Sequence, residues 1–299
     1  MKRSSPLMSR QLLAVGLVLI VPCWASASGQ PGPPRVGTFD VSVETPGGGN
    51  RIQVFYAVPA RIDASTRIVF VMHGNRRDAD HYRDIWAPYA RACGLLVVAP
   101  AFSSEQFPGF WHYQMGSAYT AAGERVAAGQ TDYAVLERIF DAVRNRFHVK
   151  ARTYDIFGHS AGAQFVHRMI LFSPHARIDT AIAANAGTYT VPDAAASLPF
   201  GLQDARLSAQ DLAHAYAARL WVLVGGEDTN PASRALNRSA AAMAQGANRL
   251  QRGRYFFRAA EQAAHEAGVP FNWRFQVVAH VGHNPAGMSA AAARILGCP

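Results

Sequence analysis

Ser160 has the surroundings of a nucleophile. It is the central residue of Gly158-His-Ser-Ala-Gly162, a G-x-S-x-G frame that follows an apolar run and precedes a helical pattern. A serine on such a sharp strand-to-helix turn adopts strained backbone angles, and glycines beside it let neighbouring chain segments approach closely. The frame therefore predicts a nucleophile elbow at Ser160. Because short patterns of this kind also occur in ordinary tight turns, the flanking segments must support the interpretation.

A hydroxyl attacks an ester or amide carbonyl only when a base removes its proton, so Ser160 needs a histidine nearby. His283 is the predicted base, because it follows the apolar strand 275–281 and begins a loop from which an imidazole can reach the elbow. His280 is the competitor. We place it inside the strand, where alternation directs its side chain into the sheet layer.

The base in turn needs an acid to orient it. Glu227 and Asp228 follow the apolar strand 220–225, and either can serve. Asp228 is preferred, because the turn after it can hold a short carboxylate through backbone N–H groups. The alternative for both residues is a structural charge at the N-terminus of a helix.

Two backbone amides are predicted to bind the oxyanion that develops during attack. One belongs to Ala161, which follows the nucleophile, and the other to Asn75, which follows the strand 67–72 and His73-Gly74. Arg76 and Arg77 come next, and we interpret them as an exposed pair beside Asp78 and Asp80, or alternatively as contacts to an anionic substrate.

No metal or cofactor is expected. His73 and His159 flank the predicted chemistry, but neither forms the helical i, i+4 histidine pair of a zinc motif, and we expect packing or hydrogen-bonding roles. An aromatic cluster at 107–113 follows the strand 95–99. From it and from a later loop, Trp111, Tyr113 and Tyr189 are predicted to line the substrate pocket, with loop packing as the alternative.

The N-terminus has the composition of a secretory signal. Three cations precede the apolar stretch 12–21 and the small residues 25–27, which predicts a signal peptide over residues 1–27. The apolar stretch is too short to span a bilayer, so we expect no stable membrane anchor and a secreted or periplasmic protein. The whole chain of 299 residues carries a formal charge of +9, which cleavage would lower to +6. The arginines are scattered and no nucleic-acid motif accompanies them, so no nucleic-acid partner is expected.

The remaining pattern predicts one α/β domain over residues 28–299, with 49% hydrophobic residues to fill its core. Segments 36–43 and 52–58 alternate as an antiparallel hairpin at the sheet edge. Strands and helices then alternate, with helices at 79–92, 131–147 and 161–172, which predicts a doubly wound, mostly parallel sheet. Residues 186–219 have little periodicity and are interpreted as a short cap or loop. Residues 231–268 are predicted to be helical in two pieces.

Together, these motifs resemble the α/β-hydrolase superfamily, and within it bacterial secreted esterases related to polyhydroxybutyrate depolymerases and feruloyl esterases. The resemblance rests on His73-Gly74-Asn75, Gly158–Gly162, Gly225–Asp228 and Val281–His283, in the chain order serine, acid, histidine. It implies an α/β-hydrolase fold with an N-terminal hairpin and a short cap, and cofactor-free hydrolysis of a small-molecule or oligomeric carboxylic ester through an acyl-enzyme. In this fold the helices that end near Cys93 and Cys298 pack on the same face of the sheet, so we expect these two cysteines to form a disulfide in an oxidising compartment.

Other functions remain open, because the same fold hosts peptidases, acyltransferases and non-catalytic binding proteins. The complete set of Ser160, Asp228 and His283 argues against a pure binding protein. An acyltransferase differs chiefly in excluding water from the acyl-enzyme, which residue patterns do not distinguish.

Overall fold

The computed structural model describes residues 35–45 and 48–299. The protein is built around one eight-stranded sheet. The signal peptide predicted for residues 1–27 lies outside the described residues. The sheet order is β1-β2-β4-β3-β5-β6-β7-β8, and β1 and β2 pair antiparallel as the expected edge hairpin. β2 is also antiparallel to β4, whereas all pairs from β4 to β8 are parallel. The strands are β1 Arg35–Thr45, β2 Gly48–Val58, β3 Arg67–Met72, β4 Leu95–Pro100, β5 Tyr154–His159, β6 Ile178–Ala184, β7 Leu220–Gly225 and β8 Arg274–Val278.

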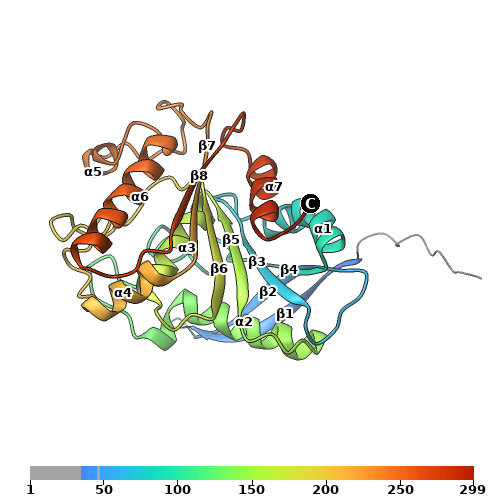
Figure 1. Cartoon of the computed structure of the whole chain (residues 1–299). Helices are drawn as coiled ribbons and strands as arrows, with labels where there is room; N and C mark the ends of the chain where they lie inside the picture. The colour runs from blue at the N-terminus through green and yellow to red at the C-terminus, as the bar shows by residue number, and fades with distance from the viewer. Residues whose placement is uncertain (1–34, 46–47) are drawn as a thin grey trace, which may run out of the picture. The chain divides into compact units, whose positions relative to one another are not determined.

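Helices cover both faces of this sheet, as its apolar strands require. The helices α1 and α7 pack against one face in a shared core, while α2, α3, α4 and α6 contribute to the core on the other face (Figure 1). They are α1 Ala79–Cys93, α2 Asp132–Phe147, α3 Ala161–Phe172, α4 Ala209–Ala217, α5 Ala240–Ala244, α6 Arg249–Glu266 and α7 Pro285–Ile295, with a short 3₁₀ helix η1 at Ala128–Gln130. The predicted α/β-hydrolase architecture, a mostly parallel sheet with an N-terminal hairpin, is confirmed.

The central strands β3 and β5 place two functional segments side by side. Their parallel register pairs Val71 with Phe157 and Met72 with Gly158, so both strands end at the same sheet edge. β5 is buried along its whole length, and α3 follows it after one intervening residue, Ser160. The loops after β3, β5 and β7 therefore converge at one edge, as ligand sites in open α/β sheets generally do.

Two parts of the fold differ from the prediction. The segment expected to be an irregular cap contains α4, which starts with a capping box between Ser208 and Asp211. This local signal was available in the sequence, but the nearby prolines and glycines obscured the helix. The strand β8 ends at Val278, so His280 lies after the strand in a turn with φ of 58° and not within the sheet layer.

The predicted disulfide between Cys93 and Cys298 is confirmed, with a Cα–Cα distance of 5.3 Å. It joins the end of α1 to the residues after α7, and these helices contact each other on one sheet face. No helix within residues 35–45 and 48–299 is long and apolar enough to cross a membrane.

Candidate active site

The turn between β5 and α3 has the strained geometry expected of a nucleophile elbow. Ser160 has φ of 58° and ψ of −111°, a combination that side-chain-bearing residues rarely adopt. A Cβ on Gly158 would lie 2.2 Å from the carbonyl oxygen of Gly162, and a Cβ on Gly162 would lie 2.2 Å from that of Met72. Both glycines are therefore required by close backbone packing, and this packing holds Ser160 in its strained conformation.

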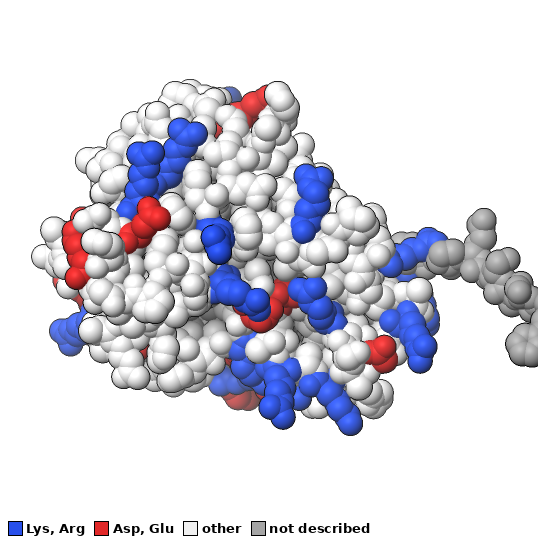
Figure 2. All heavy atoms as spheres, viewed as in Figure 1, with Lys and Arg blue, Asp and Glu red and all other residues white. Residues whose placement is uncertain are grey.

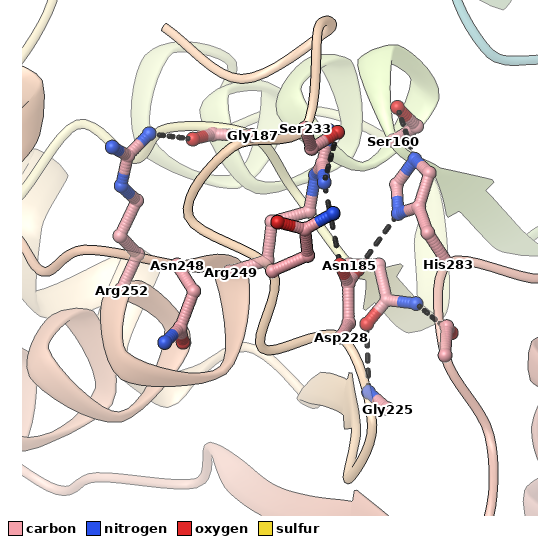
Figure 3. A network of polar contacts seen from close by, with 12 residues as sticks. Ser160, Asn185, Gly187, Gly225, Asp228, Ser233, Asn248, Arg249, Arg252 and His283 are labelled. Atoms are coloured by element: carbon pink, nitrogen blue, oxygen red, sulfur yellow. Dashed lines mark hydrogen bonds and ion pairs between the residues drawn. The ribbon is translucent and has the colours of Figure 1, made fainter. Parts of the chain in front are cut away.

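Three side chains from separate loops form a continuous hydrogen-bonded chain (Figure 3). His283 Nε2 lies 3.1 Å from Ser160 Oγ, and His283 Nδ1 lies 2.7 Å from Asp228 Oδ2. The carboxylate can only accept, so Nδ1 carries the proton and Nε2 is free to accept the proton of Ser160. This is the arrangement that a general base assisting a hydroxyl nucleophile needs.

The competing residues do not enter this arrangement. The His280 side chain is 94% exposed and lies 3.8 Å from Glu227 Oε1, so these two alternatives face one another at the surface. The structure therefore brings together the preferred histidine and the preferred acid, and leaves the second candidates outside.

Asp228 is buried, and besides His283 it has a second partner, a charged arginine that sequence reasoning missed. The Asp228 side chain is 4% exposed and that of Arg249, the first residue of α6, is 1% exposed. Arg249 Nη1 lies 3.3 Å from Asp228 Oδ1 and 3.4 Å from Ser233 Oγ. Each carboxylate oxygen thus has its own partner: Oδ1 faces Arg249, and Oδ2 accepts from His283.

Asn185 directly follows β6 and connects the loop of Asp228 to the loop of His283; sequence reasoning also missed it. Its Oδ1 accepts from Gly225 N at 2.7 Å, and its Nδ2 donates to Gly282 O at 3.0 Å (Figure 3). Its φ is 53°, in the left-handed region that asparagine tolerates better than most residues. The one sequence signal was an asparagine directly after an apolar strand, and its link to position 282 depends on tertiary structure.

Two neighbouring histidines remain neutral and take structural positions. Burial lowers the pKa of His159 well below its usual range, and His283 and Arg249 add to the effect. Its Nδ1 bonds to the hydroxyl of Tyr82 at 2.8 Å, and its ring centre lies 4.6 Å from that of His283. Burial lowers the pKa of His73 to about 3, and its Nε2 accepts from Phe102 N. Of these three histidines at the site, only His283 borders both a carboxylate and the nucleophile.

A cleft of about 300 Å³ opens over Ser160. Asn75, one predicted oxyanion donor, borders this cleft, and its side-chain oxygen accepts from Gln114 Nε2 at 3.1 Å. Ala161, the other, is the first residue of α3, where a backbone N–H has no acceptor within the helix. Other residues around the cleft include Arg76, Asp78, His81, Tyr82, His159, His283 and Pro285.

The expected aromatic lining of the substrate pocket is wrong for the two tyrosines. Tyr113 and Tyr189 are both 0% exposed. Tyr113 stacks on His73 and donates to its carbonyl oxygen at 2.8 Å, while Tyr189 stacks on Phe256. Large aromatic side chains gain most from burial, and here that preference places both tyrosines in the core.

Trp111 is partly exposed but packs edge-on against Phe110 and is not among the residues that border the cleft. The loop-packing alternative thus describes all three predicted lining residues better.

Arg77, interpreted as an exposed neighbour of Arg76, is instead partly buried. Its guanidinium donates to the carbonyl oxygens of Phe102 and Phe107 and lies over the Tyr113 ring. Within the described part of the chain, no group of three or more His, Cys, Asp or Glu side chains is arranged to hold a metal ion.

Comparison with solved structures identifies relatives of this fold. Poly(aspartic acid) hydrolase-1 from Sphingomonas sp. KT-1 is 38% identical, with a TM-score of 0.84 over 88% of this chain and 99% of that one. A poly(3-hydroxybutyrate) depolymerase from Bordetella parapertussis is 33% identical, with a TM-score of 0.80 over 88% and 89%. An S-formylglutathione hydrolase from Agrobacterium tumefaciens, 17% identical with a TM-score of 0.55 over 89% and 94%, shares the fold.

No protein-family model and no curated protein sequence matches the chain. The two solved structures above 30% identity nevertheless cover most of it, and they share its sheet architecture. The chain therefore belongs to the α/β-hydrolase superfamily, in the esterase and depolymerase group that includes these two enzymes.

Proposed function

We propose that this protein is a serine hydrolase that cleaves carboxylic esters through Ser160, His283 and Asp228. The observation that carries the proposal is the hydrogen-bonded chain from Asp228 through His283 to Ser160, which ends in an open cleft. Membership of the esterase and depolymerase group supports the same chemistry.

In the proposed reaction, Ser160 Oγ attacks the ester carbonyl carbon while His283 Nε2 takes the hydroxyl proton. The carbonyl oxygen becomes an oxyanion, and the backbone N–H groups of Asn75 and Ala161 donate to it. Each donor is worth about 3 kcal/mol of transition-state stabilisation. His283 then gives its proton to the leaving alcohol oxygen, which leaves an acyl-enzyme on Ser160.

Deacylation repeats these steps with water in place of Ser160. His283 removes a proton from the water while the water oxygen attacks the acyl carbon. It then gives that proton to Ser160 Oγ as the carboxylic acid product departs. Asp228 stabilises the imidazolium in both halves and remains ionised. The pKa of His159 stays low because it is buried, so it takes no part in these proton transfers.

Hydrolysis of an anionic polyamide is the second candidate. It is favoured by the 38% identical relative described as a poly(aspartic acid) hydrolase and by the charge of the surface. Basic side chains predominate on the face drawn in Figure 2. Arg76 borders the cleft, and among the described residues no acidic side chain forms an ion pair with it. A polyanion would be attracted to such a surface, and the attraction would weaken with salt.

Export to the periplasm or the medium is part of the proposal. The predicted signal peptide supports it, and so does the disulfide between Cys93 and Cys298, because such bonds persist in oxidising compartments.

The test is hydrolysis of p-nitrophenyl esters from acetate to palmitate by the protein without residues 1–27, beside its Ser160→Ala and His283→Ala variants. We expect turnover by the wild type and a loss of at least about 1,000-fold in kcat for each variant. Release of soluble hydroxy acids from poly(3-hydroxybutyrate), compared with release of new primary amines from poly(aspartic acid), then separates the two candidates. Full ester turnover by Ser160→Ala would exclude the proposed nucleophile.

A further inference from the structure

Arg249 is unusual among the buried arginines of the described chain because it pairs with the carboxylate of the candidate site. Arg168 and Arg252 are equally buried, but their hydrogen-bond partners are neutral oxygens and a sulfur. Arg249 Nη1 instead lies 3.3 Å from Asp228 Oδ1, and Ser233 is its other hydrogen-bond partner. A full positive charge is therefore buried beside the acid that orients His283.

The start of α6 fixes this contact. Asn248 caps the helix by accepting from Gln251 N at 3.0 Å, which sets the direction of the first turn. One residue into the helix, Leu250 N donates to Asp228 O at 3.4 Å. The backbone of α6 and the side chain of Arg249 thus both bind Asp228, and Figure 3 shows the Arg249 contact. The ion pair is therefore built into the packing of the helix.

The two oxygens of Asp228 have different partners, and this has an electrostatic consequence. His283 Nδ1 donates to Oδ2 at 2.7 Å, while Arg249 faces Oδ1. The negative charge of Asp228 favours a proton on His283, whereas the positive charge of Arg249 opposes it. In a buried site these interactions are weakly screened, so removing either charge changes the proton affinity of the Asp228–His283 pair.

We propose that Arg249 is a positioning residue that orients the Asp228 carboxylate and lowers the proton affinity of the Asp228–His283 pair. This keeps His283 available as a base at a lower pH than Asp228 alone would permit. The inference rests on the proposed function, because it requires that His283 be the base.

Other charged or titratable groups near the pair do not replace Arg249. His159 faces the His283 ring but is kept neutral by burial, and Tyr189, near Asp228, is a buried phenol whose pKa burial raises above its usual value. Arg252 lies near Arg249 and binds carbonyl oxygens. The remaining groups lie on the cleft wall or at the exposed surface beside the loops: Arg76, Asp78, His81, Tyr82, Glu227 and His280.

The test is the pH dependence of kcat/KM for a p-nitrophenyl ester in four variants. Arg249→Gln and Arg249→Met remove the charge, and Arg249→Lys retains it. Arg252→Met is the matched control, because it removes an equally buried guanidinium from the same helix that has no hydrogen bond to Asp228.

For the two uncharged Arg249 variants we expect the acid limb to move to higher pH by about one unit, a tenfold loss of kcat/KM on that limb. Much of the activity should return at alkaline pH. Arg249→Lys should restore the wild-type midpoint, and Arg252→Met should lower thermal stability while keeping that midpoint. An equal loss at every pH in Arg249→Gln, with no movement of the midpoint, would overturn the inference.

Arg249→Gln and Arg249→Met leave a buried carboxylate without its cation, which is strongly destabilising, and they can therefore fail to fold. A second comparison tests the inference in that case. Asp228→Asn and the double variant Asp228→Asn with Arg249→Gln leave no bare carboxylate. We expect the acid limb of Ser160 labelling by a fluorophosphonate to lie at higher pH in the double variant than in Asp228→Asn, and coincident limbs would contradict the inference. Full turnover by Ser160→Ala would instead show that the proposed function has failed.

Discussion

Replacing Ser160 with glycine should give a more stable protein than replacing it with alanine, although both changes abolish activity. The backbone of Ser160 has φ of 58° and ψ of −111°, in a region that glycine occupies without a steric penalty. Holding a residue with a Cβ there costs about 1–3 kcal/mol. Glycine relieves this cost but adds about 0.4–1 kcal/mol of chain entropy to the unfolded state.

Alanine is the matched control because it loses the same hydroxyl but keeps the Cβ. Both variants forfeit the hydrogen bond between Ser160 Oγ and His283 Nε2, so their difference isolates the backbone strain. We expect Ser160→Gly to exceed Ser160→Ala by about 0.5–2 kcal/mol in the free energy of unfolding. For a domain of this size that corresponds to a melting temperature higher by about 1–4 °C.

The assay is urea unfolding of both variants at one pH, with thermal unfolding as an independent measure. Neither variant should hydrolyse esters, because both lack the nucleophile. A Ser160→Gly protein no more stable than Ser160→Ala would refute the claim that close packing of Gly158 and Gly162 forces the elbow into strain.

Two further predictions concern stability. The disulfide closes a loop with a sequence separation of 205, so Cys298→Ser should lower the free energy of unfolding by up to about 5 kcal/mol. The kcat/KM of this variant should be unchanged at 25 °C, because His283 precedes the start of α7 whereas Cys298 follows its end. Urea unfolding would measure this, and equal midpoints for oxidised wild type and variant would contradict it. Burial raises the pKa of Asp132 from 3.8 to about 7, so the folded state binds a proton that the unfolded state releases, and stability falls as pH rises from about 4 to 7. Asp132→Asn should remove that loss, so its free energy of unfolding should exceed that of the wild type by up to about 4 kcal/mol at pH 8 and by little at pH 4. Urea unfolding at the two pH values measures the difference. An equal difference at both would show that Asp132 does not titrate in this window.

The sequence was most informative where chemistry and backbone geometry act locally. The glycines around Ser160 predicted an elbow because only glycine fits there: a Cβ at either glycine would lie 2.2 Å from a backbone oxygen. The strand 220–225 and the turn after it favoured Asp228 over Glu227, and the hydrogen bond to His283 agrees with that preference.

Sequence reasoning was least successful where a side chain's surroundings decide its role. Tyr113 and Tyr189 were expected at the pocket wall but lie in the core, because an aromatic residue in a loop has the same pattern whether it faces solvent or protein. The helix α4 was overlooked despite its capping box, since the irregular residues before it dominated the pattern.

The sequence by itself determined the fold class, the elbow and the order of serine, acid and histidine along the chain, because hydrophobic periodicity and glycine geometry are local properties. Only the tertiary structure decided what surrounds them. Arg249 meets Asp228 across 21 positions, and Asn185 binds Gly282 across 97. These contacts arise from how α6 and β6 pack at the sheet edge, and the sequence pattern of a buried arginine or asparagine does not specify which distant group it will bind.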